Sequence, residues 1–273
     1  MRIEVRFFAM QRAQTGKRSY QLELPDDADV AGAWAALVAD FPALASAGSS
    51  VRFARNGRYV EVDERLAAGD ELAVIPPVAG GSDGPAAPEP AAHEPAAHEP
   101  AAHEPGQGGG RRRRLAVTAD PLDDGLLHEL RADMATPADG AVTIFLGQTR
   151  ESPGTPAPGQ EADAARVAGQ RVIGLSYEAF EPMVLSVLND IADEMESRFG
   201  VRRIAIVHRV GEVPVGEVSV AIVVASPHRE AGFAACRYAI EELKARAPIW
   251  KAERYADGSV WIGAPARSGP PEA

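Results

Sequence analysis

The chain is poor in cysteine and has no long apolar run. One of its 273 residues is cysteine, Cys236, so an internal disulfide is impossible. The longest apolar stretch, around residues 218–225, is far shorter than the ~18 residues that suggest a membrane span. Charged and apolar residues alternate from Met1 to Arg6, which is unlike the apolar centre of a signal peptide. We therefore expect a cytoplasmic protein with no membrane partner.

Several common chemistries lack their motifs. The sequence holds no Cys-x-x-Cys pair, no Gly-x-Ser-x-Gly elbow and no P-loop. Its net charge of −11 argues against a nucleic-acid partner. His93, His98 and His103 recur every five residues, a spacing that aligns them on neither an α-helix nor a polyproline helix. We accordingly expect no metal site.

A low-complexity segment divides the chain in two. Residues 82–110 are almost entirely Ala, Pro, Glu, His and Gly, and Ala-Ala-His-Glu-Pro occurs three times in 91–105. Such a segment has too few large apolar side chains to form a core, which predicts a disordered tether. With the solvated arginines 111–114 at its end, the linker spans 82–114, between a domain at 1–81 and a domain at 115–273.

The first domain has the pattern of a small β-grasp fold. Alternating apolar residues predict strands at 3–7 and 20–24, forming a hairpin. Asp29 is a suitable cap for a helix that runs to Pro42. The turn Asn56-Gly57 predicts a second hairpin, and a last strand covers 71–75.

The second domain is predicted to be α+β. Its helices are placed by apolar spacing and by capping residues, and its strands by apolar runs between turns. The expected helices are 121–134, capped by Asp120, then 182–199 and 230–246; the expected strands are 115–118, 141–147, 172–178, 201–208 and 218–226.

The first domain ends in the tail Pro76-Pro77-Val78-Ala79-Gly80-Gly81. Two glycines make a tail thin enough to enter a narrow active site. In this tail and in its order of elements, the domain resembles the small, ubiquitin-like sulfur-carrier subunit of molybdopterin synthase. The resemblance implies that sulfur travels as a thiocarboxylate on Gly81.

Five blocks of the second domain resemble the large, catalytic subunit of molybdopterin synthase. They occur in family order across nearly all of 115–262, and the resemblance implies an α/β-hammerhead-type domain that forms a homodimer. The blocks are Phe145–Arg150, Tyr177–Met183, His208–Glu212, Ser226–Arg229 and Leu243–Glu253.

Basic residues within these blocks predict an anion pocket, because cations that converge in a partly dry cleft bind phosphate more strongly than cations in water. The resemblance implies that Lys244 and Lys251 are catalytic and that Arg150 and Arg229 clamp phosphate. A lysine desolvated among other cations can act as an acid, a base or a nucleophile. His208, at a strand end, is interpreted as structural. The substrate-binding positions implied by the resemblance are Gln148, Thr149, Arg150, His228, Arg229, Lys244, Lys251, Ala252 and Glu253.

The resemblance also implies the substrates and partners. Cyclic pyranopterin monophosphate would be converted to the dithiolene of molybdopterin, with no resident cofactor, and ATP would be used by a separate ubiquitin-activating-like adenylating enzyme. Gly81 is followed by Ser82, so a protease must release its carboxylate before sulfur can be loaded. Arg267 is a displaced candidate for the family's C-terminal Arg. The alternative is a non-catalytic precursor of a ubiquitin-like carrier or modifier, with a docking domain.

Overall fold

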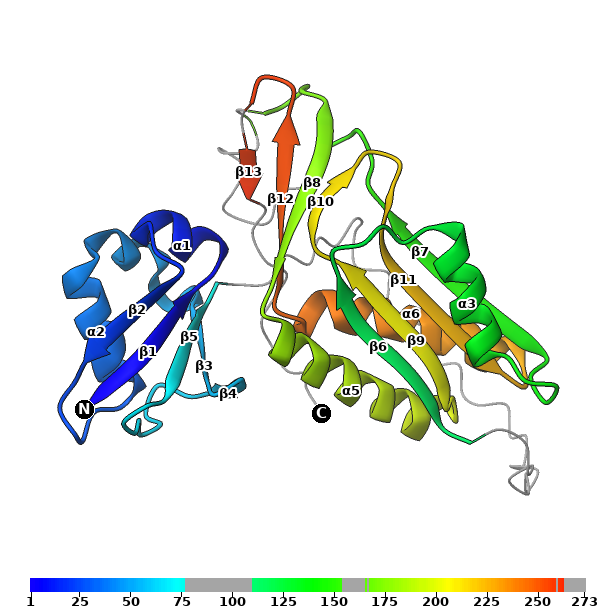
Figure 1. Ribbon diagram of the computed structural model, residues 1–273, viewed down its shortest axis with the longest axis horizontal. Helices are drawn as coiled ribbons and strands as arrows, with labels where there is room; N and C mark the ends of the chain where they lie inside the picture. The colour runs from blue at the N-terminus through cyan, green and yellow to red at the C-terminus, as the bar shows by residue number, and fades with distance from the viewer. Residues whose placement is uncertain (77–109, 154–164, 166, 259, 263–273) are drawn as a thin grey trace, which may run out of the picture.

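The computed structural model describes residues 1–76, 110–153, 165, 167–258 and 260–262. The tail residues Gly80 and Gly81, the histidine repeats and Arg267 lie outside the described residues. The described chain forms two bodies, one on each side of the linker (Figure 1).

The first body is a five-stranded mixed sheet with strand order β2-β1-β5-β3-β4, in which β1 and β5 are parallel. Helix α2 begins after Asp29, whose side chain accepts a hydrogen bond from the backbone N–H of Gly32, as expected. The predicted β-grasp fold is confirmed. Its elements are β1 (Arg2–Phe7), α1 (Ala9–Thr15), β2 (Ser19–Glu23), α2 (Val30–Asp40), the 3-10 helix η1 (Pro42–Ser50), β3 (Arg52–Arg55), β4 (Arg58–Val60) and β5 (Glu71–Ile75).

The described residues of the second body combine two sheets with helices, which confirms the α+β class. One sheet has the order β6-β9-β11-β7 and the other β10-β8-β12-β13. The elements are β6 (Arg112–Thr118), α3 (Asp124–Met134), β7 (Ala141–Gln148), β8 (Val172–Ala179), α5 (Glu181–Phe199), β9 (Arg203–Arg209), β10 (Gly211–Pro214), β11 (Val218–Ser226), α6 (Arg229–Arg246), β12 (Ile249–Tyr255) and β13 (Val260–Ile262).

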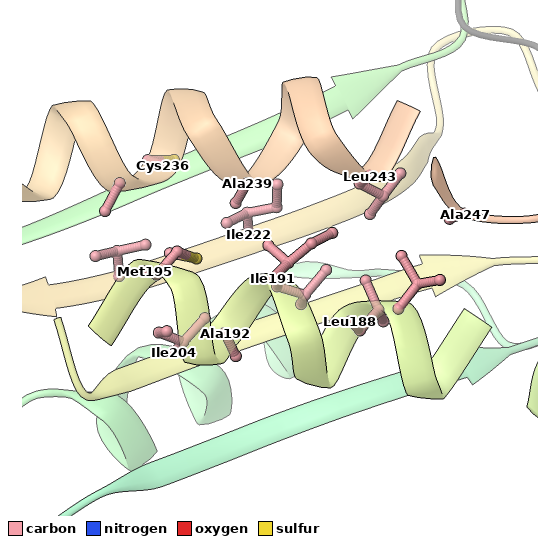
Figure 2. Packing of buried hydrophobic residues seen from close by; sticks show 14 of the residues in the cluster. Leu188, Ile191, Ala192, Met195, Ile204, Ile222, Cys236, Ala239, Leu243 and Ala247 are labelled. Atoms are coloured by element: carbon pink, nitrogen blue, oxygen red, sulfur yellow. The ribbon is translucent and has the colours of Figure 1, made fainter. Parts of the chain in front are cut away.

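Alternation along β9 and β11 separates two cores, because successive side chains of a strand point to opposite faces. One face carries Ile204 and Ile222, which pack under α5 and α6 (Figure 2). The opposite face carries Val207 and Val223, which pack under α3. Cys236 belongs to the core beneath α6, and burial raises the pKa of its thiol to about 11, which agrees with an inert cysteine.

Two predicted element boundaries, the starts of β6 and of α3, are wrong. Strand β6 begins at Arg112, inside the predicted linker, because it pairs in parallel with β9. Of the arginines expected to be solvated, Arg111 and Arg112 are exposed, whereas Arg113 is partly buried and forms an ion pair with Asp193 at 2.9 Å. Helix α3 begins at Asp124 with Asp123 as its cap, three residues after the predicted start. The sequence analysis also placed no elements at α1, β10, β12 or β13.

The two bodies touch through an apolar cluster. Phe8 lies between two aromatic rings of the second body, with centroid distances of 5.0 Å to Trp250 and 5.0 Å to Phe180. Arg12 forms an ion pair with Glu178 at 2.7 Å, and the backbone N–H of Ala9 donates to the same carboxylate at 3.0 Å. This contact docks the first body against β8, β12 and the start of α5 (Figure 1).

Candidate functional site

A cavity of about 210 Å³ opens where the two sheets of the second body meet the C-terminal half of α6. Its walls come from β7, β8, β9, β11 and β12 and from the loop after β7, so sequence blocks that lie far apart contribute to one space. The lining residues with polar or charged side chains are Gln148, Arg150, Ser152, Tyr177, His208, Ser219, Lys244, Lys251 and Glu253.

The rim of this cavity is cationic. We define the rim as Arg150, Lys244 and Lys251: Arg150 and Lys244 are exposed and Lys251 is half-buried. Lys244 lies in the last turn of α6, which points its side chain toward the cavity, while Arg150 follows the end of β7. The rim is therefore suited to an anionic group such as a phosphate.

Lys251 and Glu253 share one face of β12, because they are two residues apart on a strand. The Lys251 ammonium lies 3.1 Å from the Glu253 carboxylate, whose side chain is only 2% exposed. The hydroxyl of Tyr255 donates to the same carboxylate at 2.8 Å. Lys251 was predicted to lie among other cations, so the neighbouring carboxylate of Glu253 differs from that prediction. Glu253 holds the lysine in place and balances its charge.

The deep part of the cavity holds neutral side chains beside the buried carboxylate of Glu253. We define the floor as Tyr177, His208 and Ser219. The rings of Tyr177 and His208 pack edge to face, with their centroids 5.0 Å apart. Burial lowers the pKa of His208 to about 4, so this ring is neutral at pH 7. Burial likewise raises the pKa of Tyr177.

A bulge in β11 places Ser219 on the floor. Val218 pairs with Gln148 and Val220 pairs with Gly147, so Ser219 is an extra residue on β11. Such a bulge redirects a side chain, here toward the cavity. Glycine is required opposite it, since a Cβ on Gly147 would lie 2.6 Å from Cγ1 of Val220.

The structure brings together five of the predicted substrate-binding positions, namely Gln148, Arg150, Lys244, Lys251 and Glu253. Two neighbours do not line the cavity. The side chain of Thr149 is buried beside it, and the backbone N–H of that residue donates to the carbonyl of Glu217 at 3.0 Å. Ala252 lies on the other face of β12 and lines a separate cavity against the first body.

His228 and Arg229 lie elsewhere in this chain. They are exposed at the start of α6, in a shallow pocket that also includes Gly140 and Glu230. Lys244 is fifteen residues further along α6, or about 22 Å at 1.5 Å per residue. Within one chain, Arg150 and Arg229 therefore line different pockets.

The docked end of the first body lies close to Lys251. The indole Nε1 of Trp250 donates to the carbonyl oxygen of Pro76 at 3.1 Å, and Lys251 is the next residue of β12. Gly81 is five positions after Pro76 in the sequence, a length that an extended chain spans in at most about 17 Å. Lys251 also borders the second cavity, between β12 and helix α1 of the first body. Gly81 itself lies outside the described residues.

Sequence reasoning missed the floor and the docking contacts. His208 was interpreted as structural and Tyr177 was noted only as the start of a block. Ser219 carries no sequence signal, because its role depends on a bulge that pairing with β7 creates. Trp250 and Glu178 also lay in recognised blocks, but which residues they contact depends on the docking of a separate body.

The described residues offer neither a metal site nor a membrane span. They hold no group of three or more His, Cys, Asp or Glu side chains that could hold a metal ion. Over the same residues, no helix is both long enough and apolar enough to cross a bilayer. The cytoplasmic setting stays a prediction.

Comparisons with known proteins separate the same two parts of the chain. A family model described as MoaE protein matches residues 117–246, and the ThiS family model matches residues 5–81. The molybdopterin synthase catalytic subunit of Nostoc sp. is 40% identical over 158 residues, covering 56% of this chain and 86% of that protein. The subunit of Culex quinquefasciatus is 42% identical over 145 residues, covering 53% of this chain and 82% of that protein.

Among solved structures, molybdopterin synthase from Staphylococcus aureus is 33% identical. The alignment covers 54% of this chain and 95% of that one, with a TM-score of 0.45.

Proposed function

This chain belongs to the family of molybdopterin synthase catalytic subunits, with a ThiS-family domain fused ahead of the catalytic domain. We propose that it is a sulfurtransferase that forms molybdopterin, in which the first domain carries the sulfur and the second domain catalyses its transfer. The sulfur donor is a thiocarboxylate on Gly81, and the acceptor is cyclic pyranopterin monophosphate. The observation that carries the proposal is the position of Lys251, which borders both the cationic cavity and the contact with the docked first body.

The rim residues have different roles in sulfur transfer. The thiocarboxylate sulfur forms a bond to a carbon of the substrate and displaces an oxygen from that carbon, which leaves on the opened phosphate ester in one round and as water in the other. The acyl carbon of Gly81 is then attached to the substrate through sulfur. Water then cleaves the bond between that sulfur and the acyl carbon, so the sulfur stays on the substrate and Gly81 regains a carboxylate. Lys251 assists at the acyl carbon, Lys244 transfers protons at the substrate, and Arg150 holds the phosphate. A second round supplies the second sulfur of the dithiolene.

Loading of sulfur requires a processed chain. A glycine in a peptide bond has no carboxylate to activate, and the ThiS-family match ends at Gly81. We expect a protease to cleave the bond between Gly81 and Ser82, and an adenylating enzyme of the ubiquitin-activating type to use ATP on the new carboxylate. Intact-mass measurement of the native protein should show a fragment of residues 1–81. An active preparation that holds only uncleaved chain would overturn this route.

A homodimer through the second body accounts for His228 and Arg229. Strand β7 is an edge of its sheet, and Val142, Ile144 and Leu146 on it are 36–41% exposed. Helix α3 covers the neighbouring strands of that face, so an uncovered apolar strip remains along β7. An antiparallel pairing of β7 with its copy covers the strip.

The same pairing completes the cavity. Ala141 at the start of β7 pairs with Ser226, next to the shallow pocket of His228, while Gln148 at the end of β7 lines the cavity. An antiparallel pair sets the start of one strand beside the end of its partner. The dimer therefore carries His228 and Arg229 of one copy to the rim of the other copy, where their charge adds to the phosphate site.

The alternative, a non-catalytic precursor with a docking domain, is not favoured. The matched relatives are catalytic subunits, and the cavity holds both predicted lysines. Reconstitution tests the choice directly: residues 110–273, which include all of β6, are mixed with thiocarboxylated residues 1–81 and cyclic pyranopterin monophosphate. Formation of molybdopterin supports the enzyme, and its absence from a folded sample supports the alternative.

A further inference from the structure

The floor of the cavity presents acceptors of hydrogen bonds. The ring nitrogen Nδ1 of His208 lies 2.8 Å from the carbonyl oxygen of Arg209. A carbonyl can only accept, so Nδ1 carries the hydrogen and donates it. Because a neutral imidazole has one donor and one acceptor, Nε2 carries a lone pair. None of the described residues forms a hydrogen bond with Nε2, and the ring lines the cavity.

The two hydroxyl groups of the floor have their hydrogens directed elsewhere. Ser219 donates from Oγ to the carbonyl oxygen of Gly147 at 3.1 Å. Tyr177 therefore acts as donor in its contact with Ser219, at 3.4 Å. The remaining capacity of the Tyr177 oxygen is its lone pairs.

The rim and the floor thus favour different groups of a ligand. Arg150, Lys244 and Lys251 supply donors and positive charge, whereas His208 and Tyr177 supply neutral lone pairs. A second anionic group placed on the floor would meet acceptors without hydrogens, so burying it there is costly. A neutral group with N–H donors is the complementary ligand, because it satisfies buried acceptors that would otherwise lose their bonds to water.

We propose that His208 and Tyr177 form the subsite that accepts hydrogen bonds from the N–H groups of the substrate's heterocycle, with Nε2 of His208 as the principal acceptor. The inference rests on the proposed function, in which the substrate joins a phosphate to a pterin. It fixes the direction of binding: the phosphate occupies the rim, and the donor edge of the ring system points to the floor. His208 thereby determines specificity and holds no proton for the reaction.

The test separates the two ends of the ligand. Calorimetric titrations of the full chain use cyclic pyranopterin monophosphate, which reaches rim and floor, and inorganic phosphate, which probes the rim alone. In His208→Asn, the amide replaces Nδ1 and can still donate to Arg209, but nothing replaces Nε2. In His208→Gln, the longer amide places an oxygen near the position of Nε2. His128→Asn, on the exposed face of α3, is the matched control.

We expect His208→Asn to weaken binding of the pterin substrate at least tenfold while phosphate affinity changes less than twofold. His208→Gln should recover most of the lost affinity, and His128→Asn should bind as the parent does. A deletion of floor contacts should raise KM more than it lowers kcat, since the floor binds substrate without taking part in bond changes.

Unchanged substrate affinity in a folded His208→Asn protein would overturn the floor assignment while leaving the proposed function standing. If that variant does not fold, Tyr177→Phe carries the test: it removes one acceptor and keeps the ring, so unchanged affinity again overturns the assignment. A parent chain that binds phosphate but not the pterin substrate would overturn the floor assignment and the proposed function together.

Discussion

The indole nitrogen of Trp250 donates a hydrogen bond to the carbonyl oxygen of Pro76, 3.1 Å away. This bond joins the last described residue of the carrier domain to the strand that holds Lys251. Phe8 stacks on the same indole at an interplanar angle of 21°. The first body is thus held at both its aromatic contact and Pro76, and Pro76 lies against Trp250, the neighbour of Lys251 on β12.

Removing this hydrogen bond should weaken docking without removing the stack. Trp250→Phe keeps an aromatic ring for Phe8 but has no N–H to donate, and a neutral hydrogen bond contributes about 0.5–1.5 kcal/mol. We expect residues 1–81 to bind residues 110–273 about two- to tenfold more weakly, measured by calorimetry. Trp34→Phe is the matched control, because Trp34 lies in α2 and takes no part in the contact. Equal affinity in both variants would show that the bond does not hold the tail.

Lys251→Ala should abolish conversion and also lower stability. Truncation leaves the carboxylate of Glu253, 2% exposed, with Tyr255 but without its cation, and an uncompensated buried charge is costly. We expect Lys251→Ala to melt several degrees below the parent, and Lys251→Ala combined with Glu253→Gln to regain part of that loss. Thermal melting and molybdopterin formation are measured side by side.

The double variant separates catalysis from stability. It should remain inactive although its melting temperature recovers, because neither change restores an amine. Activity within a few-fold of the parent in either variant would remove Lys251 from the mechanism.

His208 should make the protein less stable in mild acid. Its pKa is about 4 in the native state and about 6.5 in an unfolded chain. Between these values the unfolded chain binds a proton that the native chain does not, so the free energy of unfolding falls as the pH falls. The loss is about 3 kcal/mol in total, is complete near pH 4 and is absent above pH 6.5.

Denaturant titrations at pH 7, 5.5 and 4.5 measure this loss, with His208→Gln as the comparison. Tyr177 and the charged groups around the same cavity, Arg150, Lys244, Lys251 and Glu253, are present in both proteins and cancel in the difference. A parallel pH dependence in the two proteins would contradict a neutral buried imidazole.

The fold was largely predictable because its signals are local. The Asp29 cap and the αL glycine at Gly200 mark helix ends within a few residues of sequence, and alternating apolar residues identified most strands. The strand β12 was missed because its residues alternate between two contacts, the cavity on one face and the first body on the other. Its polar residues Lys251 and Glu253 lie on the face toward the cavity and its apolar residues fall on both faces, so the period of a strand is hidden in the sequence.

The candidate site was predictable only in part. Motif resemblance located Arg150, Lys244 and Lys251, which the fold brings together. Motif resemblance could not show that Arg229 and Lys244 lie at opposite ends of one helix. Their spacing along α6 places them too far apart to share a pocket within one chain. The floor depended on long-range pairing, since Ser219 reaches it through a bulge and His208 through burial.

The proposed dimer predicts that one active site draws residues from two chains. Lys251→Ala removes a rim residue from its own chain's cavity, whereas Arg229→Ala removes a residue that serves the partner's cavity. Each variant alone should be nearly inactive. When the two are mixed and allowed to exchange, half of the dimers are mixed, and in each of these one cavity holds both defects while the other holds none. We therefore expect about a quarter of the parent activity, measured as molybdopterin formed per chain.

Ile144→Glu, which places a charge on the exposed strip of β7, should abolish the dimer in light scattering and prevent this recovery. Mixed variants that stay inactive while the parent is a dimer would place Arg229 outside the site, and an active monomer would overturn the shared cavity altogether.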